Sequence, residues 1–218
     1  MGRRSRARRR PSVGGRGLKL IAVALALALA GAVALSGCGS SKSTSSISGI
    51  PRDLLLEARP IGRGPQFHPP ARGPVIAPCR RRLGSRDGVH IELFAANRVV
   101  IVPAGIGLRG PLTTSAGRIT HARCYGQAAT LEPTGLVLVR PGSHLTVADL
   151  FRSWGQPLSA VRLGPFRADP GHRVEVFVDG RRRSGSPGST PLVRHAEIVL
   201  EVGPHVPPHK SYTFPPGT

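Results

Sequence analysis

The chain has 218 residues with 31 Lys or Arg against 11 Asp or Glu, which gives a formal net charge of +20. Aromatic residues make up only 4% of it, too few for the stacking platforms of nucleic-acid-binding sheets. The sequence contains no G-x-S-x-G, S-x-x-K or Walker phosphate-loop motif, which excludes the commonest signatures of hydrolases and nucleotide-binding enzymes.

The N-terminal segment has the three parts of an export signal. Residues 2–19 contain seven Arg, one Lys and no acid, and residues 20–35 are sixteen uncharged residues dominated by Ala and Leu. This apolar run is shorter than the about 20 residues that a bilayer-spanning helix needs. The positive charge in front of it predicts that the chain after residue 35 is exported.

The four residues that end this run, Leu35-Ser36-Gly37-Cys38, resemble the lipobox of bacterial lipoproteins. The resemblance implies cleavage between Gly37 and Cys38, a diacylglycerol on the Cys38 thiol, and a further acyl chain such as palmitate. Two or three acyl chains anchor a protein stably where one would be marginal. We therefore expect a signal peptide over residues 1–37 and an anchor on the extracytoplasmic face of the cell membrane. An uncleaved signal anchor is the alternative.

The composition after Cys38 predicts three segments. Residues 38–74, rich in Ser, Gly and Pro, predict a flexible tether with one apolar patch at 51–58. Residues 75–203 are one ordinary domain's worth of sequence, and residues 204–218 predict a Pro-rich C-terminal tail. The chain from Cys38 onward keeps 23 basic and 11 acidic residues, a net charge of +12.

The segment 75–203 contains several strand patterns and one helix pattern. A hairpin is expected over 89–107, and a second over 172–183 with its turn at Asp179-Gly180. Single strands are expected over the ranges 117–126, 135–142 and 192–203. Thr146 and Asp149 form a capping-box pattern that opens a short helix through Trp154. These elements predict a mainly β, or α+β, domain with a small antiparallel sheet.

Two cysteines remain after Cys38. In an oxidising compartment Cys79 and Cys124 suggest one disulfide bond. Two free buried thiols, or metal or redox chemistry, are the alternatives. No C-x-x-C motif is present, so a thioredoxin-like activity is not expected.

Histidines and carboxylates alternate with apolar residues in the expected strands. His90, His121 and His195 could converge into a zinc or copper site, or could be ordinary polar histidines on the sheet surface. Four glutamates are expected on the outward face of the sheet: Glu92, Glu175, Glu197 and Glu201. His195 and Glu197 are two apart on a strand and would point to the same side, as a general base with its orienting group or as a surface ion pair.

Three stretches resemble a family of exported bacterial proteins without an established activity. They are VPAGIG at 102–107, FRSWGQPLS at 151–159, and 194–215, which begins RHAEIVLE. In that family a His pair and a Leu-His-Thr-His-Asp run indicate a metal site. Here His90 is present, but the matching run, CYGQAATLEPTG, has no histidine. The resemblance therefore supports the fold and argues against a transferred metal site.

These patterns predict a non-catalytic binding or structural module of the cell envelope. A metal-binding or metal-dependent envelope protein is the alternative, and a hydrolase whose residues meet only in space is a third. The expected partners are the membrane, through the anchor, and an envelope protein or anionic polymer. Nucleic acid and a cofactor are not expected. The arginine excess fits anionic head groups or polymers, or simply a solvated surface.

Overall fold

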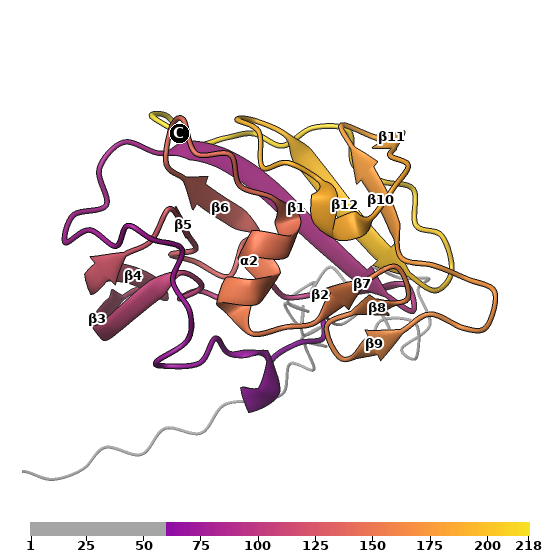
Figure 1. Ribbon diagram of the computed structural model, residues 1–218, viewed down its shortest axis with the longest axis horizontal. Helices are drawn as coiled ribbons and strands as arrows, with labels where there is room; N and C mark the ends of the chain where they lie inside the picture. Colours follow the sequence, from indigo (N-terminus) through magenta and orange to yellow (C-terminus); the bar gives the residue numbers. More distant parts are fainter. Residues whose placement is uncertain (1–59) are drawn as a thin grey trace, which may run out of the picture. The chain divides into compact units, whose positions relative to one another are not determined.

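The computed structural model describes residues 60–218 (Figure 1). The signal peptide, the lipobox with Cys38 and most of the expected tether lie outside the described residues. The described part is mainly β, as predicted, with one α-helix, α2 (Val147–Trp154), and two 3-10 turns, η1 (Pro65–Phe67) and η2 (Pro187–Ser189). In the part of the chain that the structure describes, no helix is long and apolar enough to cross a bilayer.

The strands form one large sheet and two small ones. The large sheet has the order β11-β10-β12-β1-β6-β5, and β2 also pairs with β1. Its strands are β1 (Asp87–Ala95), β2 (Arg98–Val100), β5 (Ala128–Ala129), β6 (Leu136–Val139), β10 (Glu175–Val178), β11 (Arg181–Arg182) and β12 (Glu197–Val202). The small sheets contain β3 (Leu108–Ser115) with β4 (Arg118–Tyr125), and β7 (Leu158–Ser159), β8 (Arg162–Leu163) and β9 (Phe166–Arg167).

The large sheet is mixed, which corrects the expectation of an antiparallel one. β1 and β12 run parallel, whereas the other pairings in this sheet are antiparallel. Parallel neighbours need a long crossover connection. Here that connection is nearly the whole domain, because β1 and β12 are its first and last strands.

The structure confirms the predicted turns of both hairpins and the predicted cap at the start of α2. The first hairpin turns at Ala96 and Asn97, both with positive φ, and the second turns at Asp179 and Gly180 in the same way. The Thr146 N–H donates to the Asp149 carboxylate over 2.8 Å at the start of α2.

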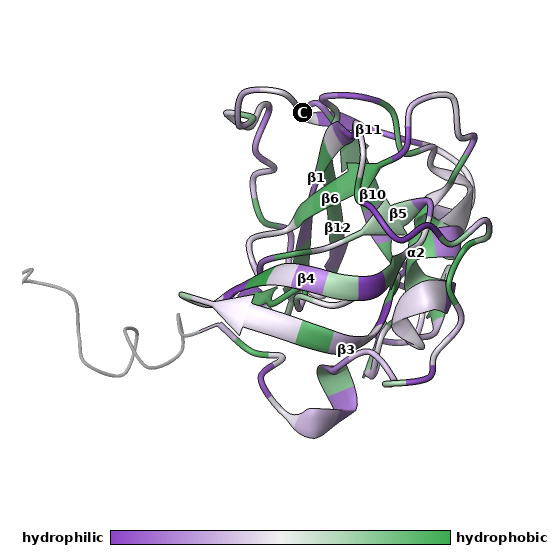
Figure 2. Cartoon of the chain, turned by 90° about the vertical axis from the view of Figure 1, so that its left-hand side faces the viewer, coloured by the Kyte–Doolittle hydropathy of each residue, from purple (hydrophilic) through white to green (hydrophobic). Residues whose placement is uncertain are grey.

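The expected strand at 117–126 is β4, whose partner β3 the sequence pattern did not predict. Figure 2 shows this hairpin largely in neutral and hydrophilic colours, and most of β3 is exposed.

The main core lies between one face of the large sheet and α2. Odd-numbered residues of β1 and even-numbered residues of β12 enter it, and α2 contributes Leu150, Phe151 and Trp154. Phe67, from the expected tether, is buried in the same core, and Ile61 forms a β-bridge with Val100. Residues 60–74 are therefore part of the domain, which corrects its expected beginning at residue 75.

Cys79 and Cys124 lie within disulfide-bonding distance, with their Cα atoms 5.5 Å apart. The neighbouring residues, Arg80 and Tyr125, exchange two backbone hydrogen bonds of 2.9 and 2.8 Å. The cysteine pair therefore joins the loop before β1 to the end of β4.

Candidate functional site beneath the C-terminal segment

A polar cluster occupies the face of the large sheet that points away from α2. The register pairs His90 of β1 with Glu197 of β12, and Glu92 follows His90 on the same face. The residues that follow His90 and Glu197 on their strands, Ile91 and Ile198, enter the core on the opposite face. The apolar–polar alternation of the two strands thus delivers one histidine and two carboxylates to one spot.

His90 and Glu197 form a buried ion pair. The two side chains belong to residues that are 6% and 1% exposed, and His90 Nδ1 lies 2.8 Å from Glu197 Oε2. The other ring nitrogen, Nε2, donates to the Thr134 carbonyl over 2.9 Å. Because a carbonyl only accepts, Nε2 must carry its proton, and Nδ1 needs a second proton to donate to a carboxylate. The geometry therefore favours an imidazolium facing a carboxylate.

The charge environment supports this protonation state. Burial lowers the pKa of His90, but the hydrogen bond and the charge of Glu197, with the Thr134 carbonyl and Glu92, outweigh it. The net effect raises the pKa above its ordinary value of 6.5. Glu197 Oε1 is also buried and has no hydrogen-bond partner among the described residues. The cluster thus has one buried acceptor left over.

The C-terminal segment, residues 203–218, covers this face. The Tyr212 ring stacks on His90 with centroids 3.8 Å apart and planes 8° from parallel. His209 Nδ1 lies 2.7 Å from a Glu92 oxygen, and His205 pairs with Glu201. Glu197 and Glu201 are therefore almost fully buried, which corrects the expectation that they lie on an outward face.

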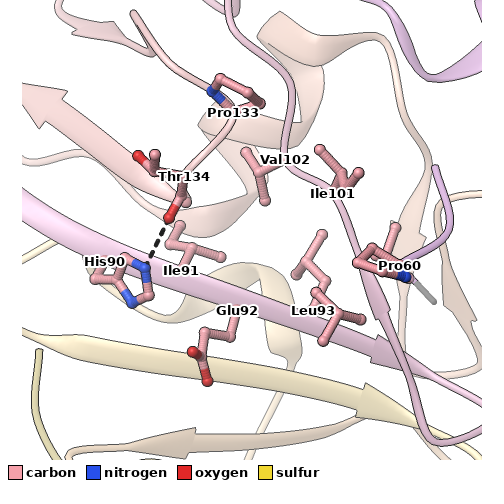
Figure 3. Close-up of a pocket in the computed structure, with 12 residues that line it drawn as sticks. Pro60, His90, Ile91, Glu92, Leu93, Ile101, Val102, Pro133 and Thr134 are labelled. Atoms are coloured by element: carbon pink, nitrogen blue, oxygen red, sulfur yellow. Dashed lines mark hydrogen bonds between the residues drawn. The ribbon is translucent and has the colours of Figure 1, made fainter. Parts of the chain in front are cut away.

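A mostly apolar pocket of about 270 Å³ lies against the edge of β1 next to this cluster (Figure 3). Its lining includes Pro60, Ile101, Val102 and Pro133. His90 and Glu92 also line the pocket, and Figure 3 shows their side chains directed away from Ile101 and Val102. The pocket therefore offers mainly apolar contact, with His90 and Glu92 as the titratable side chains of its lining.

The three sequence-predicted histidines do not gather in one place. The groups of described residues that could hold a metal ion are His90 with Glu92 and Glu197, and Glu175 with Glu201 and His205. They include neither His121, which is exposed on β4, nor His195, whose Nε2 donates to a Thr218 backbone oxygen over 2.6 Å.

The expected His195–Glu197 couple is also wrong. Glu197 bonds to His90 instead, and β12 begins only at Glu197. His195 has a left-handed φ of +63°, so the strand alternation does not extend back to it.

The arginine excess is spread over the surface. Among the described residues, Arg118, Arg152, Arg182 and Arg194 form ion pairs with carboxylates, and Arg98 also has an interaction partner. Exposed arginines without such a pair in residues 60–218 include those at 80, 81, 82, 109, 123, 173, 181 and 183. An arginine without a nearby carboxylate is free to bind an external anion.

Comparison of the chain with protein-family models, with curated proteins and with solved structures found no match.

Proposed function

We propose that the protein is a membrane-anchored lipoprotein of the bacterial envelope whose folded domain is a non-catalytic binding module for an anionic partner. The observation that carries the binding function is the surplus of exposed arginines without carboxylate partners among residues 60–218. Guanidinium groups bind phosphates and carboxylates in a bidentate way, and they remain charged at any physiological pH. The lipobox with Cys38 supports the anchor, which would hold this surface near anionic head groups and polymers.

The domain supports binding better than catalysis. Its most deeply buried titratable pair, His90 and Glu197, is covered by the C-terminal segment and stacked under Tyr212. The Glu197 carboxylate, which is 1% exposed, has no access to a substrate unless the segment moves. The large sheet is covered on this face and by α2 on the other, so a partner would bind at loops and strand edges.

The anchor predicts a change of location on a single substitution. Wild-type chain expressed in a bacterium should fractionate with membranes, and Cys38→Ala should not be lipidated and should accumulate unprocessed or in the soluble fraction. Crosslinking and purification of the tagged whole chain from membranes should recover an anionic polymer, an acidic protein or anionic lipid. Identical processing and fractionation of the two forms would contradict the anchor. An intact anchor with no enrichment of an anionic partner would contradict the binding function.

A metal-binding module is the second candidate, and the His90–Glu92–Glu197 group favours it. Their ligand atoms lie within 4.8 Å of one another, and one nitrogen with two carboxylates suits zinc or manganese. The bond from His90 Nε2 to the Thr134 carbonyl is the usual outer-shell arrangement of a ligating histidine. The unpartnered Glu197 Oε1 is an available donor. Binding would require Nδ1 to lose its proton and its bond to Glu197.

If this second candidate holds, the purified whole chain should bind about one zinc ion per molecule, and His90→Ala should abolish binding. Metal content is measured by elemental analysis after zinc loading and gel filtration. Thermal unfolding with and without zinc provides a second measure, because a bound ion raises the midpoint. His121→Ala is the matched control, since His121 is exposed on β4 and should leave both measurements unchanged. Equal metal content in the two variants would exclude the site.

A further inference from the structure

A groove at the edge of the large sheet concentrates arginines that lack partners. It has a volume of about 560 Å³ and lies along β10, β11 and the loop that follows β11. Its lining includes Arg173, Arg182, Arg183, Ser184 and Ser186. This volume is within the range of small-ligand sites, about 300–1,000 Å³.

The charge of the groove is positive even after its internal ion pair is counted. Glu175 is the carboxylate in the lining, and it is occupied by Arg182. Arg173 and Arg183 line the same groove and form no ion pair with any residue of the described range 60–218. Two guanidinium groups are therefore left to face a ligand.

The loop beside these arginines adds neutral donors. The backbone N–H groups of Ser184, Gly185 and Ser186 donate no hydrogen bond within the described part of the chain. Consecutive free N–H groups with two hydroxyls form the kind of donor concavity that binds phosphate oxygens.

The walls of the groove are held by the fold. The Arg183 N–H donates to the Val176 carbonyl over 2.8 Å, which fixes the start of the loop against β10. The Val174 N–H donates to the Ala160 carbonyl over 2.8 Å, which fixes the opposite wall next to Arg173. At the far end of the loop, Ser189 Oγ donates to the Ser186 carbonyl over 2.8 Å. Arg173 and Arg183 therefore lie just outside β10 and β11, next to backbone that these hydrogen bonds hold in place.

We infer that this groove is a phosphate-binding site in which Arg173 and Arg183 grip a phosphate group and the 184–186 loop supplies further donors. The inference rests on the proposed anionic partner and names its chemical class and its place on the domain. The phosphate comes from an anionic lipid head group or from free phosphate. Carboxylate ligands fit less well, because their two oxygens would leave part of this donor set unused.

The test compares two double variants of the whole chain purified in a non-ionic detergent. Arg173→Gln/Arg183→Gln removes the two free arginines of the groove. Arg81→Gln/Arg82→Gln removes the same charge from exposed arginines that likewise have no ion pair in the described range. The probes are inorganic phosphate and glycerophosphoglycerol, the deacylated head group of phosphatidylglycerol, titrated calorimetrically at low ionic strength. Unchanged circular dichroism confirms that each variant is folded.

The groove variant should weaken binding by at least about tenfold, and the control variant by no more than about twofold. Tighter binding of glycerophosphoglycerol than of inorganic phosphate would identify a lipid head group, and the reverse would identify free phosphate. Equal weakening of phosphate binding in both variants would overturn the assignment of the groove as the phosphate site. So would a wild type that binds neither probe but does bind micelles doped with phosphatidylglycerol, which would leave the proposed function standing. Failure to bind the doped micelles as well would also overturn the groove, whereas the proposed function is overturned only if crosslinking recovers no anionic partner.

Discussion

Glu197→Ala is expected to lower the free energy of unfolding by about 3–5 kcal/mol at pH 5.5, the usual cost of breaking a buried ion pair. At this pH the substitution leaves the His90 imidazolium buried, with the Thr134 carbonyl as its hydrogen-bond acceptor and Glu92 as the remaining nearby carboxylate. At pH 8.5 the cost should be smaller, because the ring can then lose its Nδ1 proton and remain bonded to Thr134 through Nε2. Urea unfolding at the two pH values, with chelator present, measures the difference.

The direction of this pH dependence follows from the raised pKa of His90. A group whose pKa is higher in the folded chain than its ordinary value of 6.5 binds its proton more tightly when folded. Its contribution to stability is fully present below about pH 6.5 and is lost as the pH rises through the folded pKa. A destabilisation by Glu197→Ala that is equal at both pH values, or larger at pH 8.5, would contradict the imidazolium–carboxylate pair.

Two further variants test whether the pH-dependent loss of stability arises from the His90–Glu197 pair. Glu197→Gln keeps an acceptor for Nδ1 but removes the charge, so an intermediate loss of about 1–3 kcal/mol is expected. His209 contacts Glu92, the other carboxylate facing His90. The same comparison in a His209→Asn background should therefore retain the larger loss at low pH. If the pH dependence disappears there, it belongs to His209.

The elements that sequence patterns predicted are those whose signals are local. Asn97 and the Asp179-Gly180 pair tolerate positive φ, so they located both hairpin turns. Thr146 and Asp149 located the start of α2 because the cap is a contact between residues three apart. The parallel pairing of β1 with β12 has no local signal, since it depends on which distant strands share the core.

The candidate site was predictable only in part, for a related reason. Alternation correctly assigned His90, Glu92 and Glu197 to one face, because side-chain direction in a strand has a period of two. It could not show what covers that face. The segment 203–218 is Pro-rich and resembles a solvated tail, yet Tyr212 and Phe214 within it are large rings that gain from burial. Two aromatic rings in a short Pro-rich stretch were the available signal that it docks.

Loss of the Cys79–Cys124 link is the second large effect, with an expected decrease of about 3–4 kcal/mol in the free energy of unfolding. The two cysteines are 45 residues apart, and closing a loop of that length removes this much conformational freedom from the unfolded chain. Cys124→Ser in a Cys38→Ala background should unfold at lower urea, and dithiothreitol should shift the parent to the same midpoint. A thiol assay on the unreduced parent should find no free cysteine.

The unfolding and thiol measurements also test in which cellular compartment the protein reaches its full stability. Arg86, which is buried, donates to the Gly126 and Gln127 carbonyls near Cys124, so this segment keeps a second attachment when the cysteines are reduced. The reduced chain should therefore fold but be less stable, and full stability should be reached only where disulfides form. In the Cys38→Ala background, protein made in a reducing cytoplasm should contain two free thiols, and exported protein none. Equal stability of the oxidised and reduced chains would contradict a structural disulfide and remove this support for an extracytoplasmic location.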